Sequence, residues 1–315
     1  MKRVIVFGSL NMDLSVEAAY MPAPGETING SNFIQTPGGK GANQCVAAAK
    51  LGAQVYMLGK VGDDENAAIL KKSLMTSGVI PKLLTGTTTG TAVIVRAKGE
   101  NCIILSPGAN HEVETSPFVS ILRNTARPGD IFIAQLECTH SVTFALLEEA
   151  KKQGLVTILN PAPASYVDDS VLKNVDYLIL NQTECQLITG IYPTPDNYQE
   201  ALLAFDSYNL VPIITLGKSG SVCRTNAHTI IEKGYHVTAI DSTAAGDTYI
   251  GAMAAMLAKG ETIKAAMAFA NKAAALTVTK VGAQEAIPIL QDVIDFTEGT
   301  DYPQSQPTPS PHQAV

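Results

Sequence analysis

The chain has 315 residues, of which 46% are hydrophobic and 16% are charged, and its formal net charge is −7. This length is sufficient for a large buried core, arranged as one α/β domain or as two smaller ones. The acidic balance provides no basic footprint for nucleic acids or anionic membranes, so we expect neither as a partner. Chemistry on small molecules is therefore the favoured class of function.

The N-terminal residues and the cysteines indicate a cytoplasmic protein. Residues 4–7 form an apolar run that Gly8 and Ser9 interrupt, which is too short for a signal peptide core or a membrane span. The five cysteines form no C-x-x-C pair, and the five histidines show no H-E-x-x-H spacing. We therefore expect reduced, mostly buried thiols and no histidine-based metal site.

Short apolar runs of strand length recur along the chain. The first, Val4–Phe7, ends at a glycine, and similar runs occupy residues 131–133, 156–159, 177–180 and 212–215. Helix-like stretches lie between several of these runs, for example at residues 142–153 and 182–189. This alternation predicts a doubly wound α/β fold with a mostly parallel sheet and helices on both faces.

Two segments depart from this alternation, at about residues 15–36 and 91–105. In the second segment, two apolar runs flank a turn at residues 98–101, which is typical of a β-hairpin. We expect these segments to form a small β-sheet that lies as a lid over the active site of a single domain, residues 1–299. The Pro-rich, polar residues 300–315 are predicted to be a disordered tail.

The segment Asp241–Asp247 precedes a stretch of good helix propensity. Small residues at a helix start allow its free backbone N–H groups to approach an anion closely, and the helix dipole adds attraction. We expect Ala244, Ala245 and Gly246 to cradle a phosphate, and Asp247 to act as general base toward a hydroxyl held beside it. The alternative interpretation is that Asp247 only caps the helix.

Two further motifs provide groups suited to sugar hydroxyls. Residues 37–43 hold two adjacent glycines, which allow close backbone approach to a ligand, followed by the donors Lys40 and Asn43. Asn11 and Asp13 follow the first predicted strand, where open α/β sheets present ligand-binding groups. A tight structural turn and an Asx turn, respectively, are the alternatives.

The commoner nucleotide-binding signatures are absent from the sequence. Gly217, Lys218 and Ser219 match the end of a Walker A loop, but Pro212 stands where its first glycine belongs. No G-x-G-x-x-G follows the first strand either. P-loop and dinucleotide-binding folds are therefore excluded.

In their order and separation, these three motifs resemble the ribokinase (PfkB-type) family of carbohydrate kinases. The resemblance runs from Val4 to about Pro288 and is anchored by two signatures, Gly38–Asn43 and Asp241–Asp247. It extends through residues 160–164, 181–184 and 215–220. It implies an ATP-dependent kinase with neighbouring sugar and nucleotide sites.

The family pattern assigns roles to individual residues of this chain. The residues implied to bind the sugar are Asn11, Asp13, Gly39, Lys40, Asn43, Glu137 and Asp247. Asn181 and Glu184 are implied to place Mg-ATP, with Glu184 acting on magnesium through water. The nucleotide site is implied to include Thr215, Gly217, Lys218, Gly220, Gly246 and Asn271. The family's anion hole and base correspond to Ala244, Ala245, Gly246 and Asp247.

The resemblance also implies a potassium ion beside the anion hole. Asp241 matches the family's carboxylate ligand, and backbone carbonyls are expected from Thr243, Thr277, Lys280 and Gly282. Ala286 stands where ribokinases usually supply a serine oxygen, which leaves the strength of potassium activation open. Ser242 and Cys138, where Thr and Ser are common in the family, are milder departures.

The leading interpretation is phosphorylation of the terminal hydroxyl of a pentose, with D-ribose giving ribose 5-phosphate. A kinase for deoxyribose, another small sugar or a nucleoside is the alternative on the same fold, and a non-catalytic sugar- or nucleotide-binding regulator is a further one. Family members often dimerise through their lid sheets. The apolar residues Val93, Val95, Ile103 and Leu105 are predicted to supply such a face, unless they pack on their own core.

Overall fold

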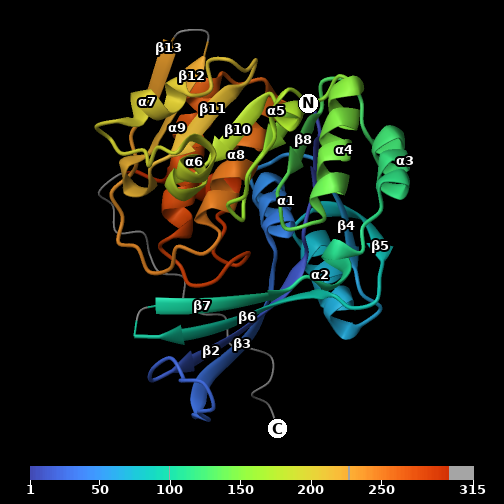
Figure 1. Ribbon diagram of the computed structural model, residues 1–315, viewed down its shortest axis with the longest axis vertical. Helices are drawn as coiled ribbons and strands as arrows, with labels where there is room; N and C mark the ends of the chain where they lie inside the picture. Colours follow the sequence, from blue (N-terminus) through green and yellow to red (C-terminus); the bar gives the residue numbers. More distant parts are fainter. Residues whose placement is uncertain (99, 226–227, 298–315) are drawn as a thin grey trace.

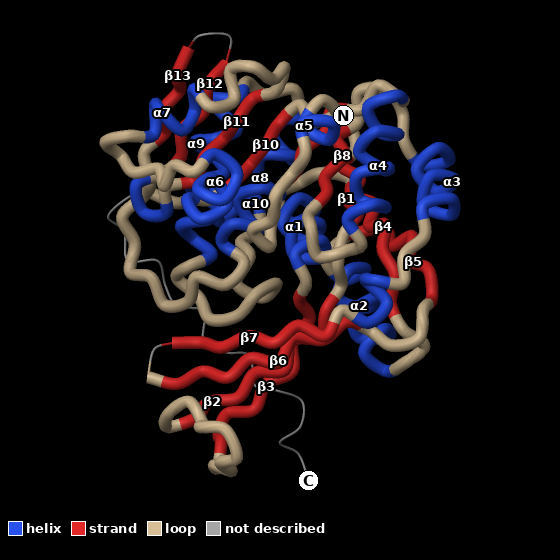
Figure 2. The backbone as a smooth tube through the Cα atoms, in the orientation of Figure 1, coloured by secondary structure: helices blue, strands red, loops and turns tan. Residues whose placement is uncertain are grey.

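The computed structural model describes residues 1–98, 100–225 and 228–297, which form a large sheet covered by helices and a small sheet projecting beside it (Figures 1 and 2). The predicted tail at 300–315 lies outside the described residues. Among the cysteines, Cys102 is exposed and the other four are buried, and all five thiols are free.

The large sheet has nine strands, and β1 (Val4–Phe7) is one of its interior strands. In order from one edge to the other, the strands are β13 (His228–Glu232), β12 (Ser221–Thr225), β11 (Val211–Thr215), β10 (Tyr177–Leu180), β9 (Val156–Leu159), β8 (Ile131–Ala134), β1, β4 (Val55–Val61) and β5 (Val79–Thr85). Only the two pairings made by β12 are antiparallel. The predicted mostly parallel sheet is confirmed.

Helices cover both faces of this sheet, as predicted. One face carries α1 (Lys40–Lys50), α2 (Glu65–Thr76), α8 (Ala245–Lys259), α9 (Ile263–Thr277) and α10 (Leu290–Asp295). The other carries α3 (Thr115–Thr125), α4 (His140–Lys152), α5 (Asp169–Leu172), α6 (Gln182–Thr189) and α7 (Tyr198–Leu203). Because successive strand residues point to opposite faces, β1 contributes Val4 and Val6 to the first core and Ile5 and Phe7 to the second.

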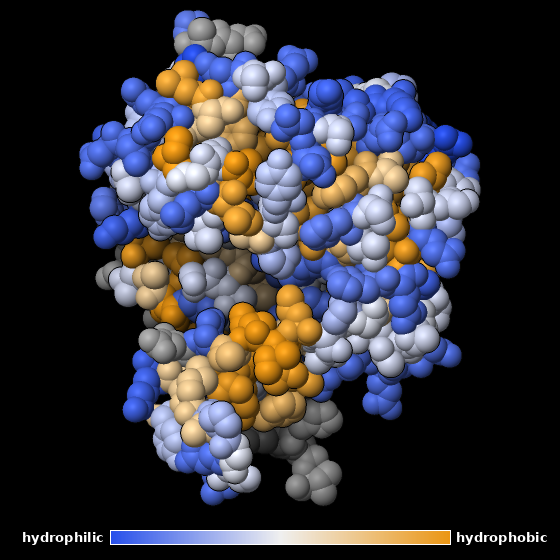
Figure 3. Space-filling model, viewed as in Figure 1, coloured by the Kyte–Doolittle hydropathy of each residue, from blue (hydrophilic) through white to orange (hydrophobic). Residues whose placement is uncertain are grey.

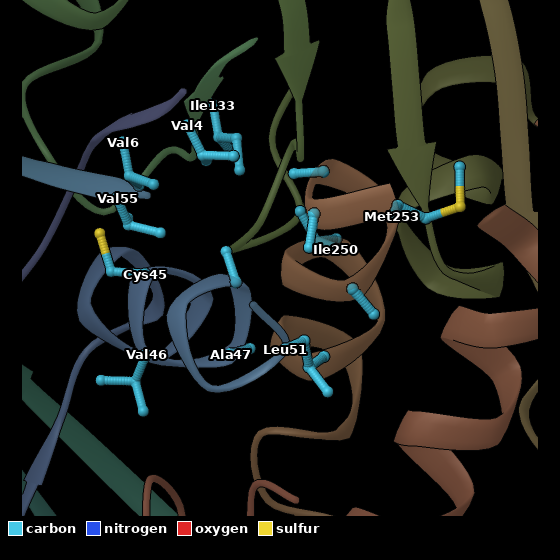
Figure 4. Close-up of a cluster of buried hydrophobic side chains, with 14 of the residues drawn as sticks. Val4, Val6, Cys45, Val46, Ala47, Leu51, Val55, Ile133, Ile250 and Met253 are labelled. Atoms are coloured by element: carbon cyan, nitrogen blue, oxygen red, sulfur yellow. The ribbon is translucent and has the colours of Figure 1, made fainter. Parts of the chain in front are cut away.

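Helices α1 and α8 pack unusually closely beneath β1 (Figure 4). A Cβ atom at Gly251 of α8 would lie 2.5 Å from the Cβ of Ala47 and 2.7 Å from the carbonyl oxygen of Gln44, so only glycine fits there. This contact brings the first turns of the two helices together, although about 200 residues separate them in sequence.

The small sheet consists of β3 (Gly30–Gly38), β2 (Asn11–Ala18), β6 (Gly90–Ala97) and β7 (Glu100–Ser106), in that spatial order. The predicted hairpin is present as the antiparallel pair β6 and β7, whereas β2 and β6 are parallel. Asn11 and Asp13 follow β1, as predicted, and they belong to the first residues of β2, so the small sheet begins earlier in the chain than the predicted residue 15.

The register of the small sheet corrects the predicted apolar face. Val93 lies opposite Ile104, and Ile94 lies opposite Ile103, so Ile103 is on the other side of the sheet from Val93. The outer face contains Leu14, Val93, Val95, Cys102 and Ile104. The inner face contains Asp13, Ser15, Ile34, Ala92, Ile94, Arg96, Ile103 and Leu105. Period-2 patterning gives alternation within each strand but not the pairing between strands.

Candidate active site

The inner face of the small sheet closes one side of a cavity of about 960 Å³. The opposite side is formed by segments that follow the carboxyl ends of β1, β8, β9 and β10, together with the first turns of α1 and α8. Its polar lining includes Asn11, Asp13, Lys40, Asn43, Glu137, Glu184, Asp241 and Asp247. Ligand sites of open α/β sheets lie at this edge.

Asp247 lies in the first turn of α8, with only 8% of its surface exposed. Its Oδ2 accepts a hydrogen bond from Asn43 Nδ2 at 3.0 Å, and its Oδ1 accepts one from Gln44 Nε2 at 2.9 Å. The N-cap of α8 is Ala244, and no side chain caps this end. The capping role considered for Asp247 is therefore excluded, because the carboxylate bonds to α1 instead.

Burial raises the pKa of Asp247, and the negative charge of Glu137 adds to the effect. The charge of Lys40 and the hydrogen bonds from Gln44 and Asn43 act in the opposite direction. Lys40, at the start of α1, keeps a raised pKa despite its own burial because Asp247, Glu137, Glu184 and Asp13 surround it. A carboxylate in this setting is a stronger base than an exposed one, as proton abstraction requires.

Asp13 and Asn11 enter the cavity from the first residues of β2. Burial raises the pKa of Asp13 to about 7, with Glu137 and Asp247 adding to the shift and Lys40 opposing it. The side chain of Asn110 accepts from the backbone N–H of Leu10, so its amide nitrogen faces Asn11 Oδ1 and donates to it at 2.8 Å. Asn11 therefore presents its own amide N–H groups as free donors toward a ligand.

The two adjacent glycines pack against the chain itself. A Cβ at Gly38 would lie 2.2 Å from the Asp13 carboxylate, and one at Gly39, where φ is +92°, would lie 2.8 Å from the backbone nitrogen of Asn11. Close contacts with the chain thus account for glycine at both positions, and Gly39 also lines the cavity, so its role in sugar binding stays a prediction. Lys40 and Asn43 come soon after these glycines in the chain, and both line the cavity.

The residues predicted to cradle a phosphate lie at the start of α8, with Ala245 and Gly246 in its first turn rather than before it. Ala244 adopts a left-handed conformation with φ at +60°, and the chain enters α8 at Ala245. A Cβ added at Gly246 would meet no heavy atom within 4 Å, so the space in front of the helix start is open. Helix N-termini with exposed N–H groups attract anions.

Asn181 and Glu184 form a capping box at the start of α6. The carboxylate of Glu184 accepts from the backbone and side chain of Asn181 and from Asn160 Nδ2, and burial raises its pKa. Glu184 lines the cavity. Within the described ranges, no three His, Cys, Asp or Glu side chains are grouped so that they could hold a metal ion by themselves.

The other residues predicted for the nucleotide, apart from Gly246, belong to β11, to the turn after it and to α9. Thr215 ends β11, and Gly217 and Lys218 form a short 3-10 helix closed by Gly220. Asn271 on α9 donates to the carbonyl of Glu232, the last residue of the edge strand β13, and to the carbonyl of Lys233, which follows it. These residues belong to neighbouring parts of the large sheet and its helices, and none of them lines the cavity beneath the small sheet.

The residues predicted as cation ligands lie on two segments of the chain that hydrogen bonds join. Asp241 Oδ1 accepts from the backbone N–H and hydroxyl of Thr243, and its Oδ2 accepts from Gly282 N at 3.0 Å. Burial alone would raise the pKa of Asp241, but these hydrogen bonds outweigh it and lower the pKa. Asp241 N donates to Val278 O at 3.2 Å, and Lys280 N donates to Thr277 O at 3.2 Å, so the segment that holds Thr277 and Lys280 is joined to Asp241. Ala286 is fully buried and supplies no side-chain oxygen.

Two polar residues of the site were not predicted from the sequence. Gln44 and Gln135 are buried, and both belong to the hydrogen-bonded network that holds Asp247. Glutamine in an Ala-rich helix carries no local signal of function. Only its position directly after Asn43 in a predicted binding motif could have indicated it.

Comparison with known proteins identifies the class of enzyme. Residues 1–290 match the model of the pfkB family of carbohydrate kinases, and the chain belongs to this family. A ribokinase of Bacillus subtilis is 36% identical over 296 residues, covering 93% of this chain and 98% of its own, and one of Haemophilus influenzae is 35% identical over 303 residues, covering 94% and 99%. The structure of an Arabidopsis thaliana ribokinase complexed with ribose and ATP superposes with a TM-score of 0.86 at 28% identity, covering 94% of this chain and 99% of that one. In the described part of this chain, no helix is long and apolar enough to cross a membrane.

Proposed function

We propose that this carbohydrate kinase transfers the γ-phosphoryl group of ATP to the terminal hydroxyl of D-ribose. The observation that carries the proposal is the placement of Asp247, a buried carboxylate at the start of α8, between sugar-type donors and the open helix N-terminus. The ribokinases that cover almost the full chain support ribose as the acceptor.

The residues of the cavity supply the steps of the reaction. Asn11, Asp13, Lys40 and Asn43 bind the sugar hydroxyls, so that the terminal hydroxyl lies within reach of Asp247. Asp247 accepts the hydroxyl proton as the oxygen attacks phosphorus. The N–H groups at residues 244–246 stabilise negative charge on the transferring group, an effect worth about 3 kcal/mol per donor in other enzymes.

Magnesium, which accompanies ATP, fits this arrangement as an ion held mainly by phosphates. Mg²⁺ retains several waters and needs only one or two carboxylates from the protein. Glu184, which lines the cavity from α6, would contact it through water. The remaining nucleotide contacts are proposed for Thr215, Gly217, Lys218, Gly220 and Asn271. When bound, the ion neutralises charge on the phosphates.

Potassium binding beside Asp241 belongs to the same proposal. The ionised carboxylate of Asp241 and the adjoining turns at Thr243 and Gly282 fit a monovalent cation that oxygen atoms surround. We expect ADP release to rise when potassium replaces N-methylglucamine, and Asp241→Ala to lose that rise. An equal rate in both salts would show that the site with Ala286 does not use the ion.

The enzyme is further proposed to be a cytoplasmic homodimer. Its five free thiols suit a reducing compartment. Apolar side chains gather over the small sheet (Figure 3), and on its outer face Val93 and Ile104 are 41% and 65% exposed. Pairing of two such faces would remove this apolar surface from water.

The substrate is tested by ADP release from Mg-ATP with D-ribose, deoxyribose, fructose or adenosine in turn. Ribose should give the highest kcat/KM, and Asp247→Ala should abolish the sugar-dependent rate. If kcat/KM were higher for deoxyribose or adenosine, that compound would be the acceptor in place of ribose. Nucleotide binding without any acceptor-dependent ADP release would overturn the kinase proposal in favour of a binding protein.

A further inference from the structure

Gln44 lies at the centre of a buried hydrogen-bond network that the proposed mechanism leaves unexplained. Its side chain is fully buried in the first turn of α1. Its Nε2 lies 2.9 Å from Asp247 Oδ1 and 3.3 Å from Asn160 Oδ1, and its Oε1 accepts from Gln135 Nε2 at 2.6 Å. One amide therefore contacts the proposed base and two further amides.

The orientation of this amide follows from its neighbours. An ionised carboxylate only accepts hydrogen bonds, so the nitrogen of Gln44 must face Asp247. The nitrogen of Asn160 is directed to Ile179 O and Glu184 Oε2, at 3.1 and 3.3 Å, which leaves its oxygen for Gln44. Each donor thus has one consistent direction, and the network runs from Gln135 through Gln44 and Asn160 to Glu184.

We infer that Gln44 is a positioning residue for phosphoryl transfer, which sets the orientation of the Asp247 carboxylate and links it to Glu184 through Asn160. This inference rests on the proposed function. Asn43 holds the second carboxylate oxygen, so the two neighbouring amides of α1 together prevent rotation of the carboxylate. The lone pairs that remain are those directed to the cavity.

The same contact affects the charge state of the base. Lys40, Glu137, Asp13 and Glu184 are the charged groups that act on Asp247 from the surrounding elements. The Gln44 hydrogen bond stabilises the ionised form and lowers the pKa of Asp247. Without it, that pKa rises, the base is ionised only at higher pH, and the acidic limb of the pH–rate profile moves upward.

The test compares Gln44→Met with Tyr249→Phe, measuring kcat/KM for ribose between pH 5 and 9. Tyr249 lies on the same helix as Asp247 and donates a buried hydrogen bond to Ser221 Oγ at 2.9 Å, so its variant loses a bond of similar burial away from the base. We expect Gln44→Met to move the acidic limb upward by about one pH unit and to lower kcat about tenfold, since a hydrogen bond to a charged group is of this strength. Tyr249→Phe should keep the parent limb.

Gln135→Met serves as the second variant, because it removes only the partner that orients Gln44. It should shift the limb in the same direction by a smaller amount, and it remains informative if Gln44→Met does not fold. Superimposable limbs in the parent, Gln44→Met and Gln135→Met would overturn the inference. A parent without ribose-dependent ADP release would instead contradict the proposed function. In that case ¹³C NMR titration of the Asp247 carboxyl, without substrate, still decides whether these variants raise its pKa.

Discussion

The floor and the roof of the cavity are built by different means. The floor consists of the first turns of α1 and α8, where Asn43, Gln44 and Asp247 are buried and hydrogen-bonded across the two helices. The roof is the inner face of the small sheet, on which Ile103 and Leu105 remain 52% and 44% exposed. Close packing fixes the reacting groups on the floor, whereas the roof contributes Asn11, Asp13 and an apolar surface that can cover a ligand.

Loss of the base should have the largest effect. Asp247→Ala removes the proton acceptor from the floor, and we expect kcat to fall about 100- to 10,000-fold, the range of general base catalysis. Ribose-dependent ADP release is the measurement, with Tyr249→Phe as a folded control on the same helix. A loss smaller than tenfold would contradict the assignment of Asp247.

Two glycines should separate catalysis from packing within the floor. Gly246→Ala places a methyl group in the open space before α8, so we expect kcat to fall about 10- to 1,000-fold while Tm is unchanged or higher. Gly41→Ala would place Cβ 2.6 Å from the Gly8 backbone, which should lower the free energy of unfolding by about 1–3 kcal/mol. Thermal melts and initial rates measure both. If the two variants lowered Tm equally, the space beside Gly246 would not be open.

The roof residue Asp13 should make stability depend on pH. Its folded-state pKa of about 7 lies above the unfolded value of 3.8, so its contribution to stability is present below pH 3.8 and is lost as the pH rises through 7. Asp13→Asn removes this loss, and its stability relative to the parent should increase from pH 5 to pH 8, by a few kcal/mol at most, at about 1.4 kcal/mol per pKa unit. Urea unfolding at several pH values checks this, and a constant difference would argue against the shift.

The outer face of the small sheet should affect association with little effect on the chemistry. Ile104→Lys places a charge on this exposed apolar face, and we expect sedimentation equilibrium to show a monomer whose kcat remains within about threefold of the parent. Ile294→Lys is the matched control, because Ile294 is 57% exposed on α10, away from the small sheet. Equal masses for the two variants would exclude this face as the interface.

Local patterns in the sequence predicted five of the nine strands of the large sheet, whereas β4, β5, β12 and β13 were not among the predicted runs. The run Val4–Phe7 is β1 residue for residue, and Gln182–Thr189 is α6, because a continuous apolar run and a capped helix carry their signals within a few neighbours. The motif at Asp241–Asp247 predicted small residues just before a helix, and α8 begins within that motif, at Ala245.

Only the tertiary structure decided which groups meet. Val93 shares the outer face with Ile104 rather than with Ile103. The alternation of apolar residues within each strand does not reveal which residues of two strands pair. Gln44 and Asn160 contact across 116 residues, and Gln44 reaches Asp247 across 203, so no local pattern could reveal their network. The sequence by itself thus indicated many of the elements and the candidate base. The packing of α1 against α8 determined the orientation of that base, because hydrogen bonds between distant residues exist only after the helices are in place.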